Sequence, residues 1–357
     1  MIMNSFHNMT ELNTPLDTLI DCIMVETKHS NASYIACIIS KIYGTLIGYC
    51  FPIIGTFNII TNSIVIVIFL ISLHHKNRYF IYLGILAISD MGINIFIGWL
   101  WLFPSYGLPY ITSGSIYYFI LTISSFYCRL FKSIQIIWCN LRGNMYIVLA
   151  FDRLLLLYKP LTYKVSSKYV IIVILIIIFI ISITMSLPII IYTDLLITQQ
   201  LLTCWFTNYS VLLSFYKVLF SNSCLFQLTL VSLVDIFFLV KMIKWSHQRH
   251  YIKNTISPLK TKQISKIKTL LLLDIISFIC SVPSSIVYMN LASLNKPNVE
   301  YIRVLTLVIH MSWALIFLQS SLNIILYYKR IDYFRQILLK FITGYHFHGR
   351  LSIIHKS

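Results

Sequence analysis

Seven long apolar stretches constrain the fold of this chain more than any other feature of its sequence. A bilayer core about 30 Å thick needs about 20 mostly apolar helical residues to cross it. The stretches run over residues 43–71, 79–103, 126–157, 169–192, 211–243, 264–290 and 302–328. Their unbroken apolar character excludes the alternation of a transmembrane β-barrel. We therefore expect an all-α membrane protein, a seven-transmembrane helix bundle followed by a short amphipathic eighth helix.

The composition and charge distribution agree with this fold. Charged residues make up 11% of the 357 residues, and the mean hydropathy is +0.81, whereas soluble proteins average about 25% charged residues. Most Lys and Arg fall in the connections after the first, third and fifth stretches and in the tail. Because basic loops face the cytoplasm, we predict an extracellular N-terminus. The net charge of +17 then reflects a belt against anionic lipid, not nucleic-acid binding.

This topology predicts three parts along the chain. Residues 1–42 form an extracellular N-terminal tail, residues 43–328 form the seven-transmembrane domain, and residues 329–357 form the cytoplasmic eighth helix and tail. Glycosylation sequons begin at Asn8, Asn31 and Asn208. All three lie on the predicted outer side, so they are candidate glycosylation sites.

Polar residues inside the apolar stretches carry the functional information, because such residues are costly in a membrane and usually functional. Asp152-Arg153-Leu154 stands at the end of the third stretch, and Cys128 lies 25 residues before Arg153. This pattern resembles the DRY motif and the disulfide spacing of rhodopsin-like (class A) G protein-coupled receptors. Leu154 departs from the motif, which has Tyr at that position.

Further residues in other stretches resemble motifs of the same family. They are Asn62 in the first stretch, Asp90 in the second, Cys280-Ser-Val-Pro283 in the sixth and Asn323-Ile-Ile-Leu-Tyr327 in the seventh. Ser281 replaces the family's Trp, Ile324 replaces its Pro, and the fourth and fifth stretches lack the usual Trp and Pro. The resemblance covers about residues 43–342 and identifies the chain as a divergent member.

The resemblance implies roles for these residues. Asp152, Arg153, Asn323 and Tyr327 would form a G protein switch, Cys280 and Pro283 a helix pivot, and Cys128 and Cys204 a disulfide. At rest Arg153 is expected to pair with Asp152, with Asp235 and Asp274 as alternative partners. The implied function is a plasma-membrane receptor that transmits an extracellular ligand signal to heterotrimeric G proteins. Cys22 and Cys37, both on the predicted outer side, could form a second bridge.

The ligand is expected to be a peptide. Gln135 stands where aminergic receptors have an aspartate, and the middle of the seventh stretch lacks the lysine that binds retinal in opsins. Candidate pocket residues combine positive charge with aromatic or polar groups: Arg129, Lys132, Gln135, Trp205 and His310. Such a set suits a peptide with an acidic group, as in neuropeptide receptors. Anchoring at the membrane interface is the alternative for the charged and aromatic members.

Arg142 is a departure from the family, which commonly has a serine there. It lies about as deep in the membrane as Asp90, so we expect the two to pair and to form a core polar network with Asn62 and Asn323. In the family the matching aspartate helps to bind a sodium ion. The guanidinium of Arg142 is expected to take the place of that ion.

Other classes of function find less support. Catalytic motifs, metal-ligand clusters and cofactor-binding motifs were not found in the sequence, so neither an enzyme nor a metal or cofactor site is expected. One alternative is a receptor-like seven-span protein without G protein coupling, such as a scavenger or chemosensory protein. A membrane transporter is a weaker alternative, because inverted repeats are not visible.

Overall fold

The computed structural model describes residues 19–27, 34–75, 78–158, 168–198, 201–206, 211–220, 224–250, 271–287 and 299–343. The candidate glycosylation sites Asn8, Asn31 and Asn208 lie outside these residues.

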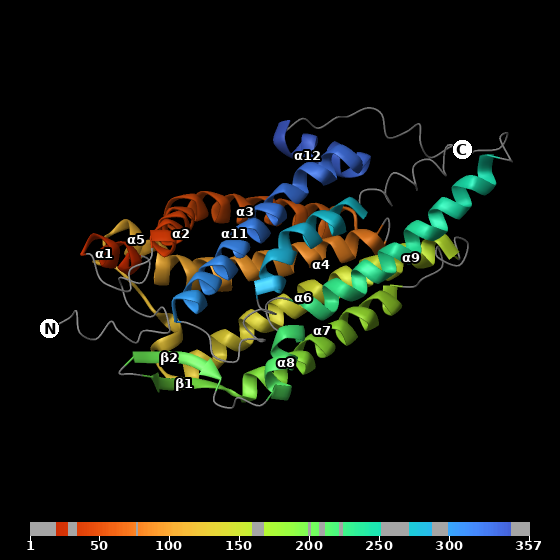
Figure 1. Ribbon diagram of the computed structural model, residues 1–357. Coiled ribbons are helices and arrows are strands. Elements are labelled where there is room, and N and C mark those ends of the chain that lie inside the picture. The colour runs from red at the N-terminus through yellow and green to blue at the C-terminus, as the bar shows by residue number, and fades with distance from the viewer. Residues whose placement is uncertain are drawn as a thin grey trace.

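Long helices form a bundle, shown in Figure 1. The first is built from α2 (Tyr34–Thr45), η2 (Leu46–Cys50), α3 (Phe51–Ile66) and η3 (Val67–Ser72), and the second from α4 (Arg78–Ile93), η4 (Asn94–Gly107) and α5 (Leu108–Ile111). The others are α6 (Ser125–Tyr158), α7 (Lys168–Ile191), α8 (Val211–Phe220), α9 (Leu225–His250), the helix Leu271–Val287 and α11 (Val299–Arg330). A short α1 (Ile20–Glu26) precedes them, η5 (Ile120–Thr122) lies before α6, and α12 (Asp332–Thr343) follows α11.

The seven-helix bundle predicted from the sequence is confirmed. Among the described residues, five helices are long and apolar enough to cross a membrane, and the shorter helix Leu271–Val287 is also apolar. The seventh member, α6, has 34 residues but carries more polar side chains. These include Gln135, Asn140, Arg142 and Arg153, which are all buried inside the bundle. Burial explains how so polar a helix is accommodated, because polar groups in a membrane must face protein rather than lipid.

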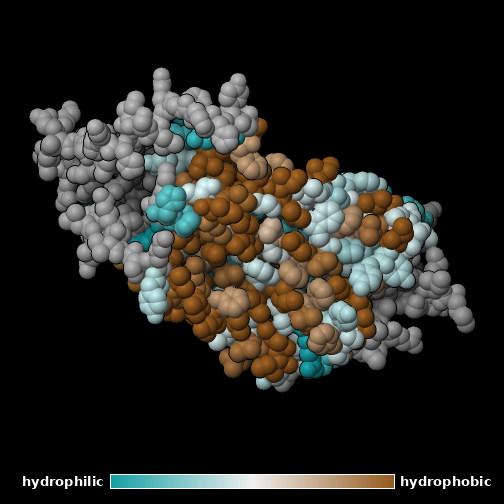
Figure 2. Space-filling model, turned by 180° about the vertical axis from the view of Figure 1, so that it is seen from behind, coloured by the Kyte–Doolittle hydropathy of each residue, from teal (hydrophilic) through white to brown (hydrophobic). Residues whose placement is uncertain are grey.

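The outer surface of the bundle is apolar. Along α7, Ile172, Ile176 and Phe179 are exposed, and Figure 2 shows hydrophobic side chains over most of the middle of one face. An exposed apolar surface of this extent marks contact with a membrane or a partner. Together with the long apolar helices, it makes the chain a multi-pass membrane protein.

Helix α6 lies in the middle of the bundle and packs against α4, α7 and α9 (Figure 1). Its approach to α4 depends on Gly92, where an added Cβ would lie 2.5 Å from the ring of Trp138 on α6. The absent side chain therefore brings this part of α4, which carries Asp90, close to α6.

A two-stranded antiparallel sheet lies beside the start of α6 (Figure 1). It consists of β1 (Thr193–Thr198) and β2 (Leu201–Phe206), with Leu195 opposite Cys204. We call this the hairpin end of the bundle and the opposite end the Arg153 end. The larger core cluster lies toward the Arg153 end and includes Phe69, Leu149 and Tyr327.

The structure differs from the sequence prediction at two of the helices. The first long helix begins at Tyr34 and not at residue 43, so α2 occupies part of the predicted tail. The predicted fifth span contains two helices, α8 and α9, and Cys224 between them has a φ of 50°. That left-handed backbone is incompatible with one continuous α-helix.

Candidate functional site

Arg153 stands near the end of α6 with 1% of its surface exposed. Its Nη2 donates to Oδ1 of Asp235 on α9 at 2.8 Å and to Oδ2 of Asp274 on the helix Leu271–Val287. Its Nε donates to the carbonyl of Leu149, one turn earlier, at 3.3 Å. One guanidinium therefore joins α6 to two other helices, and two carboxylates share one cation.

Asp152 does not pair with Arg153, so that prediction was wrong. Its Oδ1 lies 2.8 Å from Nε of Arg78, at the start of α4. Neighbouring residues of a helix point to different faces, so Asp152 reaches α4 while Arg153 reaches α9 and the helix Leu271–Val287. The alternative partners, Asp235 and Asp274, hold Arg153.

Arg142 forms a second buried cluster, with α4, α11 and the helix Leu271–Val287. Its Nε donates to Oδ1 of Asp90 on α4 at 2.6 Å, as the sequence predicted. Its Nη2 donates to Oε1 of Gln319 on α11 at 2.6 Å and lies 3.5 Å from the hydroxyls of Tyr146 and Ser277. One carboxylate and several neutral groups thus surround this guanidinium.

Helix α11 connects the rest of the expected core network. Gln319 Nε2 donates to Oδ1 of Asn323 at 3.1 Å. Asn62 Nδ2 donates to Oγ of Ser320 at 3.0 Å and to Oδ1 of Asn58 at 3.1 Å. The sequence analysis missed Gln319 and Ser320. Gln319 could have been found, because it precedes Asn323 by four residues and therefore shares its helix face.

Tyr327 is buried at the Arg153 end of α11. Its ring centre lies 5.2 Å from that of Phe69 on η3 and 5.7 Å from that of Phe334 on α12. These aromatic contacts, together with Phe334 on Phe69 at 5.1 Å, anchor α12 to the bundle. The position of α12 on the inner membrane surface stays a prediction.

The predicted pivot lies within the helix Leu271–Val287, which continues through Pro283. A proline inside a helix removes one backbone hydrogen bond and weakens the helix locally. Ser284 and Ser285 both donate side-chain hydrogen bonds to the carbonyl of Ser281, at 2.9 and 3.2 Å. Cys280, the other predicted pivot residue, is a partly buried free thiol.

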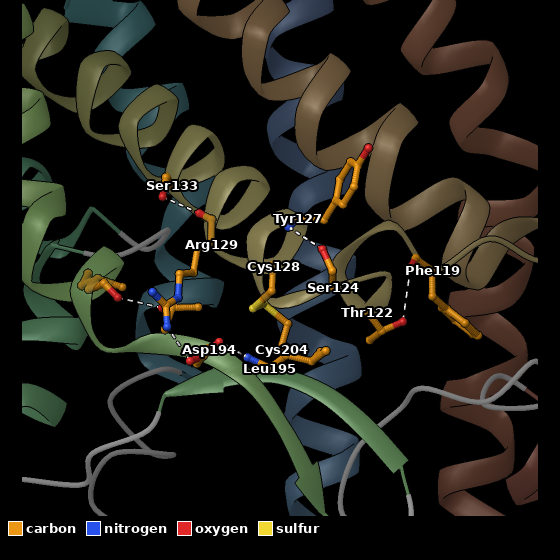
Figure 3. The surroundings of a disulfide bond; sticks show 12 residues. Phe119, Thr122, Ser124, Tyr127, Cys128, Arg129, Ser133, Asp194, Leu195 and Cys204 are labelled. Atoms are coloured by element: carbon orange, nitrogen blue, oxygen red, sulfur yellow. Dashed lines mark hydrogen bonds and ion pairs between the residues drawn. A yellow bond between two sulfur atoms is a disulfide. The ribbon is translucent and has the colours of Figure 1, made fainter.

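The hairpin end is fastened to α6 by a disulfide and an ion pair (Figure 3). Cys128 and Cys204 are bonded, as expected, and Nη2 of Arg129 lies 2.5 Å from Oδ2 of Asp194. The hydrogen bond from Arg129, with another from the backbone N–H of Leu195, holds the pKa of Asp194 below its ordinary value. Two links therefore fix the hairpin over the start of α6.

The second possible bridge, between Cys22 and Cys37, is also present. It joins α1 to α2, and Ser40 adds a hydrogen bond to Oδ2 of Asp21 at 2.6 Å. These contacts hold α1 beside the first long helix.

Three of the five candidate ligand residues, Lys132, Gln135 and His310, lie inside the bundle toward the hairpin end. Lys132 Nζ lies 4.7 Å from the ring centre of Trp101, and His310 packs edge-on against the same ring at 5.3 Å. Gln135 Nε2 donates to the carbonyl of Phe96 at 3.2 Å, while its buried Oε1 accepts no hydrogen bond from the described residues. Trp101 thus links a cation to a histidine, and a nearby amide oxygen is available as an acceptor.

The other two candidates are placed differently. Arg129 is engaged by Asp194, so its charge is already paired. Trp205 lies on β2, opposite Asp194 in the strand register, but its side chain is outside the described part of the structure. Among the described residues, no three His, Cys, Asp or Glu are grouped so that they could hold a metal ion.

Comparison with known proteins agrees with this architecture. The family model described as 7 transmembrane receptor (rhodopsin family) matches residues 61–327. A search of curated proteins gave no match. The matched region runs from α3 to the Arg153 end of α11, well over half of the chain, and contains Asp90, Arg142 and Arg153. The chain therefore belongs to the rhodopsin family of seven-transmembrane receptors.

Proposed function

We propose that this receptor transmits an extracellular ligand signal to heterotrimeric G proteins at the plasma membrane. Its N-terminus and hairpin end face outward, and its Arg153 end faces the cytoplasm. The observation that carries the proposal is the position of Arg153, which joins α6 to α9 and to the helix Leu271–Val287. A signal that separates these helices would expose a buried cation at the cytoplasmic end.

The proposed switch uses the two carboxylates unequally. When the helix Leu271–Val287 moves outward, Asp274 leaves and Arg153 keeps Asp235 as its partner. The cation is therefore not stranded during opening, which would otherwise cost several kcal/mol. Pro283 supplies the weak point about which the helix pivots. On α11, Asn323 and Tyr327 complete the switch.

The ligand is proposed to be a peptide with an acidic group. Lys132, Trp101 and His310 form a cationic and aromatic group toward the hairpin end. Gln135, with its unpaired Oε1, would accept a hydrogen bond from a peptide amide. A carboxylate on the peptide would add a charge-assisted hydrogen bond to Lys132.

A second candidate is a receptor-like protein that does not couple to G proteins. The double pairing of Arg153 favours it, because two carboxylates hold the guanidinium inside the bundle more strongly than one would. Leu154, in place of the family's Tyr, points in the same direction. The two candidates differ in whether loosening the Arg153 cluster produces a signal.

The experiment therefore loosens the cluster without needing the ligand. Asp274→Asn removes one charge from the helix Leu271–Val287 and leaves Arg153 neutralised by Asp235. We expect basal signalling, read with cyclic AMP and calcium sensors in cells, to rise several-fold over wild type. Adding Arg153→Ala to this variant should abolish the rise. Asp332→Asn, an exposed carboxylate on α12, is the matched control.

Surface delivery is measured in the same cells with an N-terminal epitope tag on intact cells, which also tests the orientation. Unchanged signalling from Asp274→Asn at normal surface levels, with sensors for every G protein class, would favour the second candidate. A rise that persists after Arg153→Ala would contradict the role given to Arg153.

A further inference from the structure

A cavity of about 350 Å³ lies among α6, α9, the helix Leu271–Val287 and α11. Its walls are mostly apolar, with Asp235 and Asp274 toward the Arg153 end. It extends along the helix from Leu271 to Ser284, which is about 20 Å at the usual helical rise. The cavity is within the usual size range of small-molecule sites.

Two sequence features shape this cavity. Ser281, which lines it, is small where the family has Trp, so the middle of the bundle is left open. Ile236, Ile275 and Phe278 also line it, and they are 56%, 45% and 42% exposed. The cavity can therefore be reached from the membrane between α9 and the helix Leu271–Val287.

The carboxyl groups beside the cavity outnumber the cation that they face. Asp235 and Asp274 share the single guanidinium of Arg153, so within the described residues the cluster is neutral only when the two carboxyls also share a proton or a second cation lies beside them. Asp274 is 4% exposed, and its Oδ1 has no hydrogen-bond partner in the described structure. An unpaired polar atom in an apolar interior costs free energy. Arg142, further along the cavity, forms an ion pair with Asp90.

We propose that this cavity binds a single-chain amphiphile with a protonated amine head. The ammonium donates to Oδ1 of Asp274 and takes the place of the proton that the two carboxyls would otherwise share. The alkyl chain lies along Val231, Ile275 and Phe278 toward Ser281. The ligand enters from the lipid and not from the aqueous side, so this site is separate from the group of candidate ligand residues at the hairpin end.

The choice of head group follows from the charges, and the choice of a single chain follows from the size. An anionic head would meet two carboxylates at the Arg153 end, whereas the cation Arg142 already has its counter-charge. A lipid with two long chains would not fit a cavity of about 350 Å³. The inference does not depend on G protein coupling, because it concerns binding alone.

The test uses the purified full chain in nanodiscs of zwitterionic lipid. A dodecylamine with a photoreactive diazirine in its chain is crosslinked, and labelled peptides are mapped by mass spectrometry. We expect labelling on α9 and on the helix Leu271–Val287. Unlabelled dodecylamine should compete with the probe, while dodecanol, which has the same chain and no charge, should not.

Variants assign the head group and the chain. Asp274→Asn should weaken competition by dodecylamine about tenfold to a hundredfold, as expected for the loss of a charged hydrogen-bond acceptor. Asp332→Asn on α12 should change nothing. Ser281→Trp refills the far end of the cavity, so the preferred amine should become shorter while the dependence on Asp274 remains.

Two results would overturn the proposal. One is competition by dodecanol as strong as that by dodecylamine, which would show that the charge is not recognised. The other is unchanged affinity in Asp274→Asn. If Asp274→Asn does not fold, the comparison of amine with alcohol and the altered chain length in Ser281→Trp still decide.

Discussion

Helix α6 carries two buried arginines that differ in the number of carboxylates around them. Arg142 and Arg153 are 11 residues apart, about 16 Å along the helix. Arg142 has one carboxylate, Asp90, and fills its other contact with Gln319 and hydroxyl groups. Arg153 has two carboxylates, Asp235 and Asp274, which come from two different helices.

The difference in the number of carboxylates makes the Arg142 cluster a permanent contact and the Arg153 cluster one that can open. Around Arg142 the charges balance, so removing either partner leaves a lone charge in the bundle. Around Arg153 one carboxylate is in surplus, so Asp274 can be removed while a neutral pair with Asp235 remains. We expect the first cluster to hold α6 to α4 and α11 in every state, and the second to open.

The largest expected effect is on folding, through the balanced cluster. Arg142→Ala leaves the carboxylate of Asp90 buried without its cation. Asp90→Asn leaves the guanidinium of Arg142 buried without its carboxylate. Each should reduce the free energy of unfolding by about 3–5 kcal/mol, seen as a lower thermal midpoint of the purified protein and less of it at the cell surface.

The double variant Arg142→Ala/Asp90→Asn leaves no lone charge and should recover part of the loss. Arg335→Ala is the control, since Arg335 is exposed and its ion pair within the described residues is with Asp332, one turn away on α12. A double variant no more stable than the worse single variant would show that the pair is not coupled.

The next effect is smaller and sharpens the comparison directly. Asp274→Asn makes the same chemical change as Asp90→Asn, but in the cluster with a second carboxylate. We expect the unfolding free energy to change by no more than about 1 kcal/mol, because the neutral pair of Arg153 and Asp235 remains after the substitution. A loss as large as that of Asp90→Asn, in the same thermal assay, would remove the distinction between the two clusters.

Sodium provides a third comparison. Because the guanidinium of Arg142 occupies one oxygen of Asp90 at 2.6 Å, a sodium ion should find no vacant charge there. The thermal midpoint of the wild type should be the same in sodium, potassium and choline chloride at constant ionic strength. A midpoint that rises with sodium alone would indicate that the ion still reaches Asp90.

The ion pair of Arg142 could be predicted from the sequence better than those of Arg153. Asp90 and Arg142 could be paired in advance, because each is a lone charge at a similar depth in an apolar helix. For Arg153 the sequence prediction placed Asp152 first, with Asp235 and Asp274 as alternatives, although adjacent helical residues point apart. Its true partners lie 82 and 121 residues away, so only the packing of α9 and the helix Leu271–Val287 selects them.

Local backbone features were also hard to predict. At the break between α8 and α9, Cys224 has a positive φ. The stretch contains no glycine or proline that would predict this conformation. The sequence prediction begins the first span at residue 43, although the apolar run of α2 already starts at Tyr34. In contrast, the Cys128–Cys204 disulfide followed from family spacing alone.

The smallest expected effect belongs to an exposed ion pair, which contrasts with both buried clusters. The Arg129–Asp194 pair is 54% and 26% exposed, so solvent and salt weaken it. Since the pKa of Asp194 is lowered, chiefly by Arg129, its stabilising contribution is complete above the ordinary aspartate pKa of about 3.9 and is lost as the pH falls through the lowered value. The gap in thermal midpoint between wild type and Arg129→Gln should therefore be small and constant from pH 7 to pH 5, and should close only at more acid pH.

High salt should narrow this gap in thermal midpoint, whereas the loss of stability caused by Arg142→Ala should persist, because buried charges are screened far less. A gap that opens or closes between pH 5 and pH 7 would mean that a group other than Asp194 sets the stability of the hairpin end.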